Sequence, residues 1–226
     1  MKSKKIYFSA IMLLSVFLVS CAQSKSSSKN DSNLAFTSIK SNVPVDIVYR
    51  QSPKCAVHVD GNALSGEKPA VVNGTLVFNS NYGKKVTVFV TSPTLDRVEL
   101  NGGGKFLMEG RVTGKTLEIK SSGEGDFHAD ELRYDNVFVE SQGVGNVNIA
   151  GQTNNLQITA NGVGNVHSEK LTANNVLAHS NGVGNVYCCA SNVMDLRLNG
   201  VGNVFYSGNP ELTNFVKKGV GKIQKI

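Results

Sequence analysis

The chain has 226 residues, of which 40% are hydrophobic and 18% charged, with 23 Gly, five Pro and no Trp. Glycine at about one residue in ten is too sparse for a collagen, and the low charge is not typical of a coiled coil or a disordered chain. The formal charge of +6 falls to +3 without Lys2, Lys4 and Lys5, since 20 basic residues then stand against 17 acidic ones. No clustered basic and aromatic face accompanies this small excess, so we expect no nucleic-acid partner.

The N-terminus has the pattern of a secretory signal. Residues 1–5 are basic, and residues 6–19 are apolar apart from two Ser. A run of about 14 residues fits a signal-peptide core and is shorter than the roughly 20 that a membrane span needs. Cys21 follows Leu18, Val19 and Ser20, which resembles a bacterial lipobox. We predict that residues 1–20 are removed and Cys21 is lipidated; the alternative is an ordinary signal with a coincidental Cys.

Residues 21–35 are rich in Ser, Lys and Asn and have almost nothing to bury. This composition is typical of a flexible tether. Together with the lipid anchor it predicts a lipoprotein of the cell envelope. The sequence leaves open whether the body faces the cell surface or the periplasm.

A short glycine motif repeats through the rest of the chain. The pattern Gly-x-Gly-x-apolar starts at seven positions separated by 21, 20, 19, 20, 18 and 19 residues: Gly102, Gly123, Gly143, Gly162, Gly182, Gly200 and Gly219. Apolar residues alternate with others between the copies, as in residues 117–119, 156–158 and 196–198. Alternation at period two indicates strands, and units this short bury a core only when stacked.

We therefore predict an all-β fold, a single-chain β-solenoid (β-helix) with 19–20 residues per rung. The motif residues would form its corners, where Gly accepts positive φ or a close backbone approach. Asn after the second Gly tolerates left-handed geometry and can build an amide ladder. The predicted corner residues are Gly143, Gly145, Asn146, Gly162, Gly164, Asn165, Gly182, Gly184, Asn185, Gly200, Gly202 and Asn203.

Aligning the copies predicts which side chains point inward. The position two residues after the motif holds mostly small or apolar residues, so we expect it to face the core: Met108, Ala129, Ile149, Ser168, Cys188 and Tyr206. The position before it should face outward by alternation. Along the stack it forms a candidate binding stripe that begins at Leu107 and continues through His128, Asn148, His167, Tyr187 and Phe205.

Residues 36–100 alternate less regularly, with apolar residues at Val43, Val45, Ile47 and Tyr49 and again around Cys55. We expect them to be further rungs with degenerate corners that begin the same stack. Residues 36–226 would then be one solenoid domain, with irregular rungs over 36–100 and repeats over 101–226. No polar capping segment follows the last motif, which predicts an open and adhesive C-terminal rung.

The signal, the lipobox, the alternating lead-in and the repeated GVGNV copies resemble the bacterial envelope family called putative auto-transporter adhesin, head GIN domain, known from Bacteroidetes-type bacteria. The resemblance covers roughly residues 36–226. It implies a right-handed β-solenoid in the envelope, with the lipid anchor in the outer membrane of a Gram-negative bacterium, and it suggests adhesion. It brings no catalytic residues with it.

Residues that could carry chemistry do not form a recognised set. Cys55 alternates with valines and should be buried, Cys188 should point inward and Cys189 outward, and Cys55 lies too many rungs away to bridge either. The four His have no metal-ligand spacing, and GEGD at 123–126 is the one copy with the Asp of a calcium repeat. Acidic residues cluster at Glu124, Asp126, Asp130, Glu131, Asp135 and Glu140, where a solvated face is the simpler interpretation than a glycosidase pair.

Residues 141–206 contain 13 Asn and only four charged side chains, Glu169, Lys170, Asp195 and Arg197. Such a neutral face suits hydrogen bonding to sugars or to another β surface, although ladder stacking also favours Asn. We therefore predict a non-enzymatic, adhesin-like scaffold without metal or cofactor, whose partners are the membrane and a carbohydrate, a host or matrix surface, or a second copy. The alternatives are a periplasmic assembly protein that self-associates through solenoid ends, and a carbohydrate-active enzyme.

Overall fold

A computed structural model describes residues 35–60, 68–80, 82 and 86–226. These residues form fifteen strands and no helix, which confirms the all-β prediction. The strands are β1 (Ser38–Ser41), β2 (Asp46–Gln51), β3 (Ala56–Asp60), β4 (Ala70–Val72), β5 (Thr75–Phe78), β6 (Thr87–Ser92), β7 (Arg97–Leu100), β8 (Lys105–Ser121), β9 (Asp126–Ser141), β10 (Val147–Ala160), β11 (Val166–Ser180), β12 (Val186–Leu198), β13 (Val204–Gly208), β14 (Glu211–Lys217) and β15 (Ile223–Lys225).

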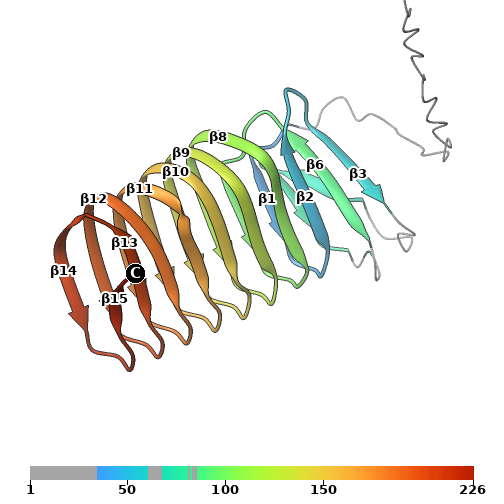
Figure 1. Cartoon of the computed structure of the whole chain (residues 1–226). Coiled ribbons are helices and arrows are strands. Elements are labelled where there is room, and N and C mark those ends of the chain that lie inside the picture. The colour runs from blue at the N-terminus through green and yellow to red at the C-terminus, as the bar shows by residue number, and fades with distance from the viewer. Residues whose placement is uncertain (1–34, 61–67, 81, 83–85) are drawn as a thin grey trace, which may run out of the picture.

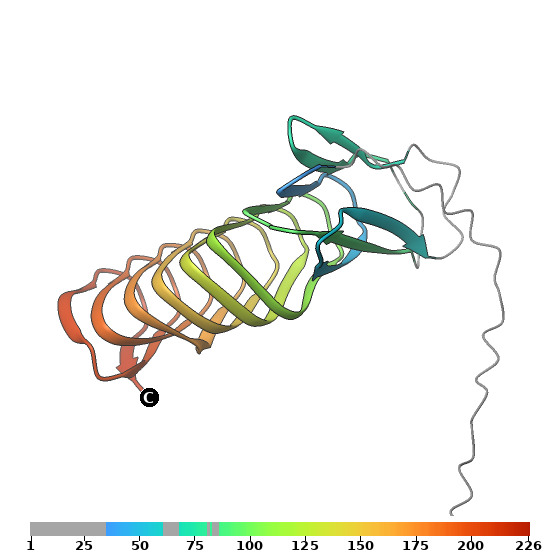
Figure 2. The same cartoon turned by 90° about the horizontal axis from the view of Figure 1, so that it is seen from above.

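The repeats form a β-solenoid, as predicted. Each of the long strands β8 to β12 bends around most of one turn and pairs in parallel with the strand of the next turn. Strands β13, β14 and β15 continue the stack, which has about six turns in all. The turns lie side by side like a coil, with the motif corners along one edge (Figures 1 and 2).

The core is a set of in-register columns inside the coil. Strand alternation places one side chain in two inside, and the buried column after the corner contains Phe106, Phe127, Val147, Val166, Val186 and Val204. The two Phe rings stack with centroids 5.4 Å apart and planes 5° apart. The side chains predicted to face inward are buried from Met108 to Cys188, and Tyr206, in the last turn, is half-buried against the core.

The N-terminal part joins the same stack but does not follow sequence order. Strands β1 and β2 lie between β5 and β6 on one side and β7 and β8 on the other, all in parallel. The prediction that residues 36–100 form only further rungs is wrong for β3 and β4. These strands pair antiparallel, β3 with β6 and β4 with β5. Between β4 and β5 the chain reverses at Asn73 and Gly74, whose φ angles of 49° and 73° are those of a two-residue hairpin turn.

The two ends of the solenoid therefore differ (Figure 1). At the N-terminal end β3 and β4 cover the edges of β6 and β5. Cys55, which precedes β3, is half-buried there rather than buried as predicted; among the described strands β3 pairs with β6 alone. In the last described turn β14 pairs only with β12, and Leu212 and Phe215 are exposed.

Candidate functional site

The first glycine of each motif is required by the close approach of successive turns. A Cβ at Gly143, Gly162 or Gly182 would overlap the carbonyl oxygen of the corresponding glycine one turn earlier. None of these three has a positive φ, so the steric reason applies and the conformational one does not. Positive φ occurs instead at the second glycine of the first copy and of the last three, as in Gly104 (93°), Gly184 (145°) and Gly202 (142°).

The asparagines after the second glycine form the predicted amide ladder. The backbone N–H of Asn165 donates to Oδ1 of Asn146 (3.0 Å), that of Asn185 donates to Asn165 (2.9 Å), and that of Asn203 donates to Asn185 (2.9 Å). Their backbone is not left-handed as expected, since the one described residue other than Gly with a positive φ is Asn73. The side chain is therefore needed as an acceptor for the next turn rather than for its turn geometry.

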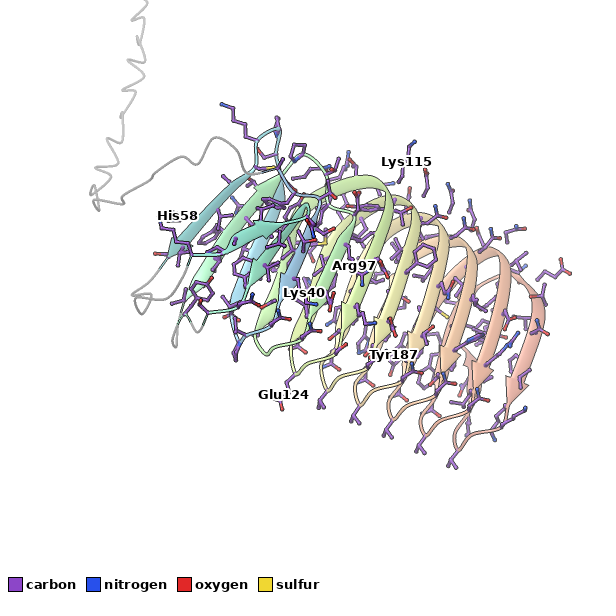
Figure 3. The ribbon with its side chains drawn as sticks, turned by 180° about the vertical axis from the view of Figure 1, so that it is seen from behind. Lys40, His58, Arg97, Lys115, Glu124 and Tyr187 are labelled. Carbon is purple, nitrogen blue, oxygen red and sulfur yellow. The ribbon has the colours of Figure 1, made fainter. Side chains whose placement is uncertain are left out.

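The residue between the two glycines points into solvent and is apolar in five consecutive copies. This valine ridge comprises Val144, Val163, Val183, Val201 and Val220, whose exposed fractions lie between 51% and 71%. Backbone bridges hold the last four of them in register. Figure 3 shows the corner side chains pointing away from the body, with Glu124 labelled at the position that precedes Val144. Sequence reasoning missed the ridge, although the repeated GVG was the signal.

The candidate binding stripe forms a single row on the outside of the solenoid. Strand register pairs each member with the next one along the row, in the order Leu107, His128, Asn148, His167, Tyr187, Phe205. The rings of His167 and Tyr187 stack with centroids 4.6 Å apart, and those of Tyr187 and Phe205 at 4.9 Å. Tyr187 therefore has both ring faces covered and presents its edge and hydroxyl to solvent.

These rows run side by side, because the three positions follow at intervals of two residues within each turn, as in Val163, Asn165 and His167. We call the valine ridge, the asparagine ladder and the stripe together the corner flank. In the turns that run from Val144 to Phe205, none of these three rows contains a Lys, Arg, Asp or Glu. The corner flank combines exposed valines, amides and aromatic edges over four turns.

A small hollow interrupts the stripe. It has a volume of about 160 Å³ and is lined by side chains from three successive turns, among them His128, Asp130, Asn148, His167, Glu169 and Lys170. His128 Nε2 lies 2.7 Å from Asp130 Oδ1, and His167 Nδ1 lies 3.5 Å from Glu169 Oε1. Glu169 Oε2 is shielded from solvent and has no hydrogen-bond partner.

The structure does not bring the clustered acidic residues together. Asp126 accepts the backbone N–H of Asn146 (2.9 Å) and takes part in the ladder. Glu131 pairs with Arg111 and Arg133, and the hydrogen bond from Arg111 lowers the pKa of the Glu131 carboxyl. The other acidic residues lie apart too. Asp130 lies beside His128, and Glu140 forms an ion pair with Lys120 (3.1 Å). Asp135 accepts a hydrogen bond from the Asn154 side chain (3.4 Å), and Glu124 lies at the corner (Figure 3).

The cysteines and histidines form no shared centre. The three cysteines of the described ranges are all free, and burial raises the pKa of the Cys188 thiol to about 12. His128 and His167 are two turns apart with Asn148 between them. Across the described residues no group of three His, Cys, Asp or Glu side chains is placed to hold a metal ion. The same part of the chain contains no helix of the length and apolarity that a membrane crossing requires.

The predicted signal peptide, Cys21 and all but the last residue of the tether lie outside the described residues. Their roles stay predictions.

Residues 35–210 match the family described as putative auto-transporter adhesin, head GIN domain, and the chain belongs to this family. No curated protein matches it. A crystal structure of a putative adhesin from Bacteroides fragilis NCTC 9343 is similar at 32% identity and a TM-score of 0.80, covering 85% of this chain and 93% of that one.

Two more distant crystal structures share the fold. A putative adhesin from Parabacteroides merdae ATCC 43184 is 18% identical with a TM-score of 0.63, covering 85% of this chain and 92% of that one. A protein from Parabacteroides distasonis ATCC 8503, described as a putative lipid binding protein, is 19% identical with a TM-score of 0.66, covering 85% and 94%. At these identities the likeness concerns the fold alone.

Proposed function

We propose that the protein is a non-enzymatic, adhesin-like binding scaffold of the cell envelope. Residues 1–20 direct export, Cys21 carries the lipid that anchors the chain in the outer membrane, and residues 21–35 hold the solenoid away from it. The adhesin family supports a role in surface binding and an envelope location. The lipobox around Cys21 and the Ser-rich segment after it support the anchor.

The corner flank is the observation that carries the proposal. Half-exposed valines stacked on a corner add only a few tenths of a kcal/mol each to the stability of the folded monomer, and contiguous apolar surface marks interaction sites. Here five such residues stand in one row beside amides and aromatic edges, without a charged residue among them. Because the turns are linked by parallel strand pairing, these groups form a rigid array that needs little ordering when it meets a partner surface.

Location is tested first by protease treatment of intact cells, with cells opened at the outer membrane as the control. A solenoid that is digested on intact cells faces outward and supports adhesion. One that is protected until the membrane is opened contradicts it. Cys21→Ser serves as the anchor control, since we expect this variant to be released from the membrane fraction.

Binding is tested with purified protein on surfaces coated with mucin glycans or matrix proteins. Val183→Asp places a charge in the valine ridge, and we expect at least several-fold weaker binding. Gln157→Asp is the matched control, because Gln157 is an exposed residue on another face of the solenoid. Equal binding by both variants, or no binding by the unmodified protein, would refute the role of the corner flank.

Self-association through a solenoid end is the second candidate. Exposed Leu212 and Phe215 on strand β14, which pairs with β12 alone, favour contacts between two C-terminal ends. Sedimentation over a range of protein concentrations tests it. A concentration-dependent dimer that Phe215→Asp abolishes would support this function; a single monomeric species throughout would eliminate it.

A further inference from the structure

The hollow in the stripe results from short side chains at one turn. The outward residues of the turn at 147–150 are Asn148 and Ala150. Register places Asn148 between His128 and His167, and Ala150 beside Lys170. The neighbouring turns thus carry long side chains where this turn carries short ones. The result is a notch one turn wide, with Asn148 as its floor.

The dimensions of the notch match one six-membered ring. His128 and His167 are two turns apart, which is roughly 10 Å at the strand spacing. Carbon contacts at about 3.5–4.0 Å on both sides would occupy 7–8 Å of that gap and leave room for a puckered ring. Tyr187 covers one face of the His167 ring, so the other face borders the notch. The volume of about 160 Å³ is too small to enclose a second ring.

The polar groups of the notch match hydroxyls. Asp130 and Glu169 supply acceptors, Lys170 supplies a donor, and the Asn148 amide supplies both. Two carboxylates disfavour an anionic ligand, and the lysine disfavours a cation. A hydroxyl both donates and accepts, and so suits this mixture. The other carboxylate oxygen, Glu169 Oε1, lies 3.5 Å from His167 Nδ1, on the side of the notch that His167 forms.

We propose that this notch binds a single uncharged pyranose ring of a glycan, held between His128 and His167 above Asn148. The proposal rests on the adhesin function and specifies its ligand class. A ligand of about a dozen heavy atoms in a shallow site should bind with a dissociation constant on the order of 1 mM. Useful affinity would then come from many copies on one cell surface.

The test is an NMR titration of the purified full-length protein with the methyl glycosides of glucose, galactose, mannose and N-acetylglucosamine. We expect at least one of them to give saturable shifts confined to the amides of residues 128–130, 148–150 and 167–170. Asn148→Phe fills the notch while continuing the aromatic row, and should weaken binding at least tenfold. Gln157→Phe introduces the same ring in the same turn but on another face, between Phe138 and Leu177, and should leave binding unchanged.

Glu169→Gln removes the charged acceptor with little change of shape, and should weaken binding several-fold. The proposal is overturned if no glycoside gives saturable shifts up to about 50 mM, some fifty times the expected constant. It is also overturned if Asn148→Phe binds as the unmodified protein does. In either case, coated-surface binding that Val183→Asp weakens would leave the adhesin function standing without this site. If the unmodified protein bound none of the coated surfaces, the adhesin function itself would be contradicted.

Discussion

Replacing the first glycine of a motif by alanine should separate two turns of the solenoid. In Gly182→Ala the new Cβ would overlap the Gly162 carbonyl oxygen and lie 2.6 Å from the Asn161 carbonyl carbon, whereas ordinary contact begins at 3.4 Å. Relief of the contact with the Asn161 carbon alone requires a shift of about 0.8 Å, and the closer Gly162 oxygen requires more. Two of the backbone hydrogen bonds that tie this corner to the preceding turn run from Gly182 to the Ala160 carbonyl and from Val183 to the Gly162 carbonyl, both at 2.9 Å.

That shift would lengthen both bonds to about 3.7 Å, beyond hydrogen-bonding range. At about 0.5–1.5 kcal/mol for each bond, we expect the free energy of unfolding to fall by roughly 1–3 kcal/mol. Gly103→Ala is the matched control within the first copy of the motif. Its Cβ would meet only the Pro44 side chain, at an ordinary 3.8 Å, and its φ is not positive. Alanine there should be neutral or stabilise by up to about 1 kcal/mol through the unfolded chain.

Urea unfolding followed by circular dichroism measures both variants. Amide hydrogen exchange at Val183 and its neighbours shows whether the loss is local, as the nearest-neighbour energetics of a repeat fold require. If the two variants differed by less than about 0.5 kcal/mol, the close approach of the turns would not be what requires glycine at this position.

Three further outcomes are expected. Asn165→Ala removes the acceptor for the Asn185 backbone N–H and should cost about 1–3 kcal/mol in urea unfolding, whereas Asn165→Asp should cost less, because Asp126 already serves as such an acceptor. Val183→Thr should change the unfolding free energy by less than about 0.5 kcal/mol because the side chain is exposed; a larger loss would assign the ridge to stability. Burial raises the pKa of both the Cys188 thiol and the Tyr134 phenol, so the unfolding free energy should fall as the pH rises above about 9, where the unfolded thiol ionises, and further above about 10, where the unfolded phenol ionises; a urea midpoint unchanged from pH 8 to pH 11 would contradict this.

The repeated part of the fold was predictable because its period is nearly constant. Equal turn lengths bring equivalent residues into rows, so alignment of the copies alone correctly indicated that Met108 is buried and that His167 and Tyr187 are neighbours. The amide ladder followed from the same alignment. The reason for each glycine did not follow from the alignment. Close approach and positive φ both select Gly, and only the backbone geometry distinguishes them.

The N-terminal part was less predictable. Alternation identifies strands but not their partners, so it could not show that the turn of β1 and β2 lies between two later ones. The antiparallel pair β4 and β5 did have a local signal, Asn73-Gly74 between two apolar runs, which is the strongest short-range indication of a hairpin. No comparable signal marks β3, whose pairing depends on β6 some thirty residues later.

In a solenoid a row of identical side chains is evidence of function only where stacking does not explain it. Stacking explains the corner glycines, because a side chain there would overlap the neighbouring turn. It also explains the asparagine ladder, because each asparagine side chain accepts a hydrogen bond from the next turn. Stacking does not require the valine ridge. Gly103 and Glu124 occupy the same position in the first two copies, so the corner also accepts a glycine or a charged residue. The notch at Asn148 is the converse case, a short side chain in a row whose next three members, His167, Tyr187 and Phe205, stack their rings. These two departures are therefore where the fold leaves room for a partner to determine the residue.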